Sequence, residues 1–400
     1  MNNALYWIWI QQAVGQGSSA VPKLLKAFSS PTDIYAADRL TLEKAGISGK
    51  ALDGLCRKTL NGAERLLERA LKHGWILTLD DESYPNGLRQ IYSPPLVLYG
   101  SGVLPLFNEP SAPPIAVVGT REATAYGEEA AGGMAAGLAA VGCLVISGGA
   151  RGIDRAAHEG AMYGGGKTVA VQACGLDVEY PLKNRLMRRH ILEQGGALIT
   201  EYAPGTIVHK HHFTVRNRLI SGLAWGVCVA EAPQRSGALI TARTAREQDR
   251  DVFVIPGNIT SAESYGSNEL IKEGAQMVSR PSEILAVYQH RFGDALDEAE
   301  ADRAQTAYGE YQRMSEAVPV PSESPAARLA DRPLSELQEC PEDISEDAKR
   351  IFAALSDVPQ NVEDVCATAG LPVNRAFVAL TQLEMFGCIR NHPGKRYSRG

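Results

Sequence analysis

Residues 147–154 read Ser-Gly-Gly-Ala-Arg-Gly-Ile-Asp and come directly after an apolar run that ends at Ile146. Small residues at Ala156, Ala157 and Ala161 then follow a helical spacing. A strand, a glycine-rich turn and a helix in this order present backbone N–H groups to an anion. The stretch therefore predicts a βα unit with a phosphate site at the carboxyl end of its strand.

A second turn of the same kind lies upstream, where the apolar run 115–118 leads into Gly119, Thr120 and Arg121. Arg121 adds a guanidinium, which holds phosphate through forked, charge-assisted hydrogen bonds. The alternative is a tight turn that needs glycine and leaves the arginine in water. Two such turns in one chain favour a phosphate-rich ligand, either a nucleotide or a nucleic-acid strand.

Strand and helix patterns alternate between residues 76 and 290. Continuous apolar strands separated by helices are typical of a mostly parallel sheet covered on both faces, so we expect an α/β domain here. The expected strands are 115–118, 143–146, 168–171, 197–200, 226–231 and 252–255. The expected helices are 123–140, 152–163, 182–193, 217–223 and 238–249.

Three further segments flank this core. Residues 1–75 predict a small helical domain, with helices at 21–28, 39–45 and 51–72. Its glycine turn at 46–49 resembles that of a SAM-like or helix-hairpin-helix domain, and an ordinary bundle turn is the alternative. Residues 291–345 are acidic and contain Pro and Ser, which predicts a solvated linker. Residues 346–400 predict helices at 346–355, 362–369 and 373–386 and a basic hairpin, a winged-helix pattern.

Composition narrows the class of protein. A chain of 400 residues exceeds one compact core, so we expect two or three domains. It has no apolar run long enough for a bilayer and no basic signal-peptide start, which predicts a cytoplasmic protein without a membrane partner. Seven dispersed cysteines without a C-x-x-C pair indicate reduced thiols and no zinc site.

The net charge of −6 does not exclude a nucleic-acid ligand. Residues 291–348 hold 5 Lys and Arg against 15 Asp and Glu. The rest of the chain holds 35 basic and 31 acidic residues, so the acidity is confined to one segment. Local clusters of positive charge are what bind phosphate.

Polar and basic residues mark three more candidate contacts. Lys183 and Asn184 begin a basic helix that either lines a groove or forms a solvated face. In the stretch 209–218, Phe213, Arg216, Asn217 and Arg218 fit backbone contact and base stacking on a single strand, with core packing as the alternative for Phe213. Ser236 and Gly237 open a third helix, as an anion site or a plain serine cap.

The sequence contains no motif that indicates a catalytic site. The turns match neither the dinucleotide fingerprint nor a Walker A loop, and no catalytic triad is present. The histidines at 209, 211 and 212 have no nearby carboxylate or cysteine to complete a metal set. We therefore predict no enzyme activity, no metal and no cofactor.

Together the motifs resemble the DNA-processing protein A (DprA/Smf) family, in the family's order over about residues 110–280. The motifs are Val118–Arg121, Ser147–Asp154, Tyr180-Pro181, Arg216–Leu223, Ser236–Thr241 and Val254–Gly257. The first two supply Gly119, Thr120, Arg121, Ser147, Gly148, Gly149 and Gly152 as phosphate-binding candidates. The resemblance implies that Arg121 grips phosphate, that Lys183 contacts DNA and that Asn184 and Arg216–Arg218 lie in pocket motifs.

The same resemblance implies an extended Rossmann-like domain that binds single-stranded DNA and forms a homodimer. The implied function is natural transformation (competence) and DNA recombination, by protecting incoming DNA and loading the RecA recombinase. The winged helix and the helical front resemble variable accessories of the family. Two alternatives remain: a Rossmann-like enzyme that hydrolyses nucleoside monophosphates or nucleotide sugars, and a transcription regulator that reads duplex DNA through helix 373–386.

Overall fold

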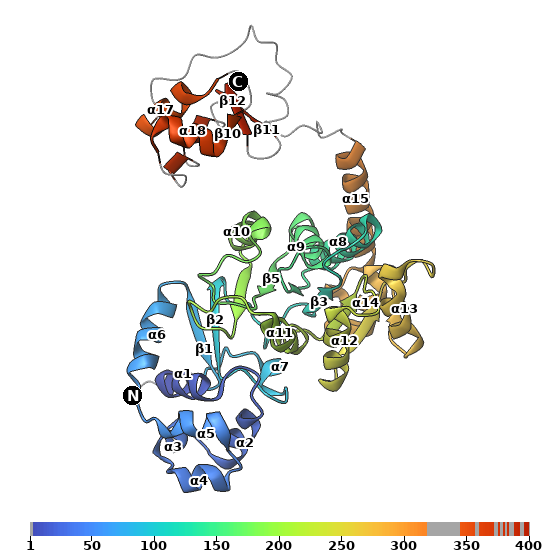
Figure 1. The fold of residues 1–400 in the computed structure, drawn as a ribbon. Coiled ribbons are helices and arrows are strands. Elements are labelled where there is room, and N and C mark those ends of the chain that lie inside the picture. The colour runs from blue at the N-terminus through green and yellow to red at the C-terminus, as the bar shows by residue number, and fades with distance from the viewer. Residues whose placement is uncertain are drawn as a thin grey trace. The chain divides into compact units, whose positions relative to one another are not determined.

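The computed structural model describes residues 3–317, 345–356, 360–371, 375–376, 379–380, 382–383, 388–392 and 396–399. Two compact units divide the chain, Met1–Gln312 and Arg313–Gly400 (Figure 1). None of the helices in the described ranges combines the length and the apolar composition that a bilayer crossing requires.

A nine-stranded sheet forms the centre of the first unit, in the order β1-β2-β6-β5-β4-β3-β7-β8-β9. Strands β3 to β9 pair in parallel. Beyond β6 the sheet is antiparallel, because β2 pairs with β6 and β1 pairs with β2. The strands are β1 (Trp75–Thr78), β2 (Val97–Gly102), β3 (Ile115–Val118), β4 (Val145–Ser147), β5 (Thr168–Val171), β6 (Ala197–Thr200), β7 (Gly226–Val229), β8 (Asp251–Val254) and β9 (Gln276–Met277). The predicted parallel sheet is confirmed.

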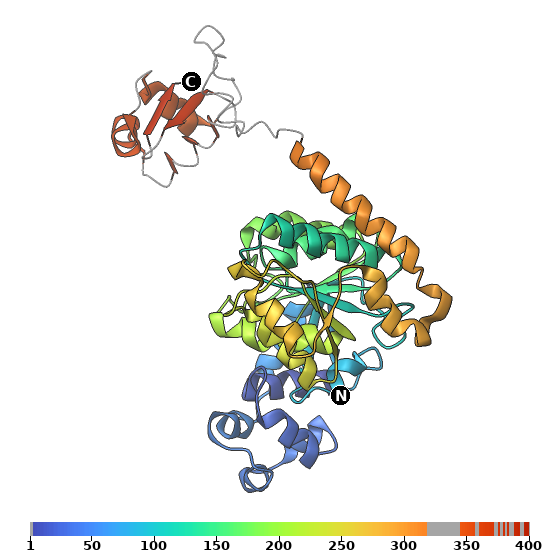
Figure 2. The same ribbon diagram turned by 90° about the vertical axis from the view of Figure 1, so that its right-hand side faces the viewer.

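Helices cover both faces of this sheet, as Figure 2 shows. One face holds α8 (Ala125–Ala140), α9 (Ile153–Tyr163), α10 (Arg185–Glu193) and α14 (Pro281–Phe292). The other holds α11 (Lys210–Leu223), α12 (Gly237–Glu247) and α13 (Tyr265–Lys272). Helices α8 and α9 pack closely where Gly160 meets the backbone of Gly132. The approach requires glycine at residue 160, because a Cβ atom there would collide with that backbone.

The order in which the chain connects the strands beside β3 indicates where a ligand site would lie. The chain leaves β3 for β4 on one side of it, and later returns to β7 on the other side. This reversal makes the carboxyl ends of β3 and β7 the topological switch point of the sheet, where open α/β sheets leave a crevice for a ligand.

The N-terminal helices α1 (Asn3–Val14), α2 (Ala20–Ala27), α3 (Pro31–Ala36), α4 (Arg39–Lys44), α5 (Gly49–Cys56) and α6 (Asn61–Leu71) pack beside the antiparallel strands. Helix α1 is buried around its whole circumference from Tyr6 to Gln11, so it lacks the amphipathic pattern of a surface helix. The Gln11 side chain accepts hydrogen bonds from the amides of Leu96 (2.9 Å) and Val97 (3.1 Å) and donates to the Glu201 carbonyl (2.9 Å). The helical front and the sheet thus share one compact unit, and a domain boundary at residue 75 stays a prediction.

In the segments that flank the sheet, the structure corrects two sequence expectations. The helix expected over 51–72 is two helices, because α5 ends at Cys56 and α6 begins at Asn61. The acidic segment 291–345 is not a linker throughout, since it contains the short helix η3 (Gly293–Ala295) and α15 (Glu298–Ala317). Tyr308 of α15 is buried where Gly132 of α8 leaves room for its ring, and this contact gives an acidic helix a packed face.

The second unit contains α17 (Glu346–Ala354), β10 (Gln360–Asn361), α18 (Val362–Ala369), β11 (Ile389–His392) and β12 (Arg396–Arg399). The strands form an antiparallel sheet in the order β10-β12-β11, and β11 and β12 make the predicted hairpin. The helix expected over 373–386 lies largely outside the described residues. Helices α17 and α18 with a three-stranded sheet, in which β10 precedes α18 and the hairpin β11–β12 follows it, confirm the winged-helix prediction.

Candidate functional site

A cavity of about 540 Å³ opens at the switch point, beyond the ends of β3 and β7. Its walls come from the turn after β3, the turn after β4, the first half of α11 and the start of α12. These segments lie far apart in sequence and meet because parallel strands end at the same edge of a sheet. The fold thus places the predicted turns around one cavity.

Backbone hydrogen bonds join the turns to one another. The Thr120 amide donates to the Glu231 carbonyl (2.7 Å), and the Ile153 amide donates to the Thr120 carbonyl (3.1 Å). Gly152 has a φ of +72°, and a Cβ atom there would collide with the carbonyls of Thr120 and Arg121. Glycine is therefore required where the second turn passes under the first.

The protein's own side chains bond some of the amides at or just before the helix starts that the sequence suggested as anion sites. Glu231, which is buried, accepts hydrogen bonds from the amide and the hydroxyl of Thr124 (both 2.8 Å) at the start of α8. The Asp154 carboxylate accepts from the Ala150 amide (3.2 Å), and the Ser236 hydroxyl accepts from the Ala238 amide (3.2 Å). These amides are not available to a ligand, whereas the cationic side chains of the cavity are.

Five cationic residues line the cavity. Arg121, Arg151, Lys210 and Arg235 are exposed, and Arg216 is buried. Two acidic residues share the lining: Glu122 pairs with Arg151 (2.8 Å), and Asp154 lies deeper. Positive charge therefore exceeds negative charge around the cavity, as an anionic ligand requires.

Arg216 forms the base of this charge cluster and is only 3% exposed. Its Nη1 donates to the Val171 carbonyl (2.6 Å), and its Nε finds no acceptor among the described residues. Burial lowers the pKa of Arg216, whereas the nearby Asp154 carboxylate raises it. Burial likewise raises the pKa of Asp154, against the effect of Arg216.

Phe213 supports Arg121 directly. The Arg121 guanidinium carbon lies 4.2 Å from the centroid of the Phe213 ring, which is cation–π distance. This stacking holds an exposed guanidinium over the cavity and occupies part of the Phe213 ring. Phe213 therefore positions Arg121, a role that the sequence reasoning did not assign to it.

The structure brings together eight of the fifteen predicted contact residues at the cavity: Gly119, Thr120, Arg121, Phe213, Arg216, Asn217, Ser236 and Gly237. Four others form the end of β4 and the turn after it without lining the cavity: Ser147, Gly148, Gly149 and Gly152. The hydroxyl of Ser147 is buried and donates to the Val117 carbonyl (2.7 Å). These residues shape the site from behind.

The remaining three predicted residues lie outside the lining. Asn184 is buried and donates to the carbonyls of Gly149 (3.1 Å) and Ala150 (2.9 Å), so it holds the turn after β4. Lys183 is exposed on the short helix η1 (Leu182–Asn184). Arg218 turns away from the cavity.

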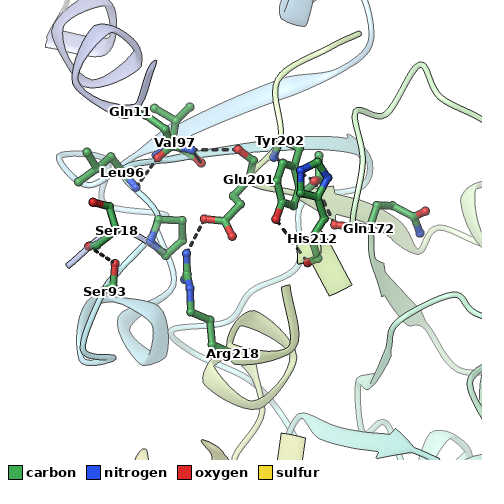
Figure 3. A network of polar contacts seen from close by, with 12 residues as sticks. Gln11, Ser18, Ser93, Leu96, Val97, Gln172, Glu201, Tyr202, His212 and Arg218 are labelled. Atoms are coloured by element: carbon green, nitrogen blue, oxygen red, sulfur yellow. Dashed lines mark hydrogen bonds and ion pairs between the residues drawn. The ribbon is translucent and has the colours of Figure 1, made fainter. Parts of the chain in front are cut away.

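Arg218 forms an ion pair with Glu201, whose side chain is fully buried (Figure 3). The backbone carbonyl of Glu201 accepts the bond from Gln11 described above, and the same figure shows both contacts. Burial raises the pKa of Glu201, and the Arg218 charge opposes this shift. The pair belongs to the junction between the helical front and the sheet, and this explains why Arg218 does not reach the ligand cavity.

Sequence reasoning missed three cationic lining residues: Arg151, Lys210 and Arg235. Each of the three lies inside or directly beside one of the motifs described in the sequence analysis. Their position next to a turn between a strand and a helix is the sequence signal that could have identified them. In the described ranges, no group of three His, Cys, Asp or Glu residues is arranged to hold a metal ion. His212 instead stacks on Tyr202, with 4.3 Å between ring centroids.

This is an extended Rossmann-like protein with an accessory winged helix. The class is defined by the order of the strands in the sheet, by the cavity at the switch point and by the C-terminal wing. The chain belongs to the DNA recombination-mediator protein A family, which matches residues 75–289. The DprA winged helix domain matches residues 321–395.

Three comparisons illustrate this membership. Protein Smf of Synechocystis sp. is 33% identical and covers 98% of each chain. DNA processing protein DprA of Streptococcus pneumoniae is 43% identical over 52% of this chain and 72% of its own. The X-ray structure of DprA from Streptococcus pneumoniae superposes with a TM-score of 0.61 at 34% identity, covering 72% of this chain and 98% of that one.

Proposed function

We propose that this protein binds single-stranded DNA through the cavity at the switch point and catalyses no reaction there. The convergence of Arg121, Arg151, Lys210 and Arg235 on one cavity carries the proposal. Cations arranged along a groove, with an aromatic residue among them, suit a flexible phosphate backbone. Phe213 supplies that aromatic residue.

The cellular role that follows is recombination mediation. A homodimer in the cytoplasm would protect incoming single strands during natural transformation and load the RecA recombinase onto them. The family's name, recombination mediator, and the name DNA processing protein carried by the pneumococcal relative support this role. The winged helix would serve as an accessory to it.

The test is binding of fluorescent oligo(dT) to the full-length protein at several salt concentrations. Arg121→Ala should weaken binding by about tenfold to a hundredfold, because a charge-assisted contact to phosphate is lost. The slope of log K against log salt should fall by about 0.7 for each phosphate contact removed. The control is Arg65→Ala, which removes an exposed arginine of α6.

Unchanged oligo(dT) binding by a folded Arg121→Ala protein would contradict the proposal. Circular dichroism establishes that the variant is folded. An equal loss in the Arg65→Ala control would show that the effect is general surface charge and not this cavity.

Hydrolysis of a nucleotide is the second candidate, and Asp154 is the observation that favours it. This carboxyl group lines the cavity and is buried, and burial raises its pKa, as in carboxyl groups that act as acids or bases. Incubation with nucleoside monophosphates, followed by chromatography for released base, separates the two functions. Base release that Asp154→Asn abolishes would favour the enzyme, and absence of release favours the binding protein.

A further inference from the structure

Tyr180 is an aromatic side chain beside the cavity that the proposed function does not use. It is 39% exposed, and its ring centroid lies 5.8 Å from that of Phe213. Phe213 in turn carries the Arg121 guanidinium at 4.2 Å. The planar groups of Arg121, Phe213 and Tyr180 thus form a row, with Phe213 in the middle.

The loop that carries Tyr180 is fixed at several points. Arg188 of α10 is buried and donates to the Val178 carbonyl (3.1 Å). Asp177 accepts from the Gly205 amide (2.7 Å) and pairs with Arg69 (2.6 Å). On the other side of Tyr180, Asn184 anchors η1 to the turn after β4.

This anchoring has an energetic consequence. A ligand that contacts a fixed ring does not have to order the loop first, so little conformational entropy is lost on binding. Tyrosine itself has few rotatable bonds and a large flat surface. The loop therefore holds the Tyr180 ring in a fixed position before a ligand binds.

The sequence neighbours of Tyr180 include exposed apolar and charged side chains, among them Glu179, which pairs with Arg185 (3.0 Å). Leu182 and Leu186 are 71% and 59% exposed, and Lys183 is exposed between them. Exposed apolar side chains that are close in sequence, as these are, can form a binding surface. A ligand with flat apolar parts and negative charge matches both properties, and a single strand of nucleic acid has both.

We propose that Tyr180 is a stacking platform for a nucleobase of the strand whose phosphates occupy the cavity. The inference rests on the proposed function and adds a contact to the bases, where the cavity contacts the backbone. Aromatic stacking of this kind tolerates any base, because every base has a π face. The surface formed by Tyr180, Leu182 and Leu186 then extends the binding track from the switch point toward α10.

The test compares two ligands of equal length: oligo(dT) and a strand in which every base is replaced by an abasic residue. Tyr180→Ala should weaken oligo(dT) binding by about tenfold, the usual effect of losing one stacked base. It should leave binding of the abasic strand unchanged, because that strand offers only phosphates. Tyr180→Phe should bind both strands like the wild type, and Tyr180→Leu should behave like Tyr180→Ala.

The matched control is Tyr92→Ala, which removes a tyrosine that is 76% exposed elsewhere on the unit. Equal weakening on both strands would assign Tyr180 a structural role in holding Phe213 and would overturn the inference. Unchanged oligo(dT) binding in Tyr180→Ala, with Arg121→Ala still weakened, would overturn it as well. A wild-type protein that binds neither strand at low salt would instead overturn the proposed function.

Discussion

The guanidinium of Arg216 lies against Gly148, and a Cβ atom at residue 148 would collide with its nitrogen atoms. Arg216 is buried at the base of the cavity and is fixed by its bond to the Val171 carbonyl. The turn after β4 and the charged base of the cavity therefore fit together only while residue 148 has no side chain.

Gly148→Ala should lower the free energy of unfolding by about 1–3 kcal/mol, the usual cost of overpacking a buried site. Urea denaturation of the full-length protein measures this change. Gly237→Ala is the control, because a Cβ atom at residue 237 meets nothing within 4 Å among the described residues. Equal stability of Gly148→Ala and the wild type would contradict the packing described here.

Asn184 and Lys183 are neighbours with different expected effects on DNA binding. Asn184→Ala removes two hydrogen bonds that hold the turn after β4, so it should weaken oligo(dT) binding without changing the salt slope. If Lys183 contacts phosphate, as the family resemblance implies, Lys183→Ala should reduce that slope by about 0.7. Titrations at four salt concentrations distinguish these effects, and an unchanged slope in Lys183→Ala would exclude Lys183 as a DNA contact.

Removal of one partner of the Glu201–Arg218 pair should be strongly destabilising. Glu201→Leu leaves the Arg218 charge largely buried without its partner, which costs about 3–5 kcal/mol in comparable pairs. The double variant Glu201→Leu/Arg218→Met should recover most of this loss, because no charge stays unpaired. Denaturation of the wild type, both single variants and the double variant gives the coupling energy, and additive effects would argue against a tight pair.

His158 should make the fold sensitive to acid. Burial lowers the pKa of His158 to about 3, with Arg216 adding to the shift, whereas the unfolded chain has a value near 6.5. Below pH 6.5 the unfolded chain therefore takes up a proton that the folded chain does not, so stability falls as pH falls. The slope is about 1.4 kcal/mol per pH unit between about pH 6 and pH 3.

His158→Gln removes this titration and retains a side chain that can bond Thr168, the present partner of His158 at 2.7 Å. The wild type should lose stability relative to the variant as pH is lowered from 6 to 4. A difference in unfolding free energy that stays constant over this range would show that His158 does not titrate as expected.

The central sheet was predictable because its strands are buried on both faces and read as short apolar runs. The antiparallel strands β1 and β2 and the last strand, β9, were not predicted from the sequence. Strand β9 has only two residues, and both are exposed. The break between α5 and α6 has no glycine or proline to signal it. A tertiary contact marks it instead, because the Trp9 indole donates to the Arg57 carbonyl (3.0 Å) directly after α5 ends.

The turns of the candidate site were predictable from glycine and strand patterns, but the direction of the arginines was not. The sequence placed the start of a helix at residue 217, whereas α11 begins at Lys210. Within one helix, Arg216 and Arg218 are separated by about 200°, so they face opposite sides. One lines the cavity and the other reaches Glu201, a buried partner that local sequence does not reveal.

Arg121, Arg151, Lys210 and Arg235 reach the cavity from four stretches of chain that only folding brings together. A denatured chain therefore has no comparable binding site. Any ligand that contacts all four side chains shifts the folding equilibrium toward the native state. The midpoint of thermal melting should accordingly climb as the concentration of such a molecule is raised. Heat resistance thereby becomes a reporter of occupancy that needs no label on either component.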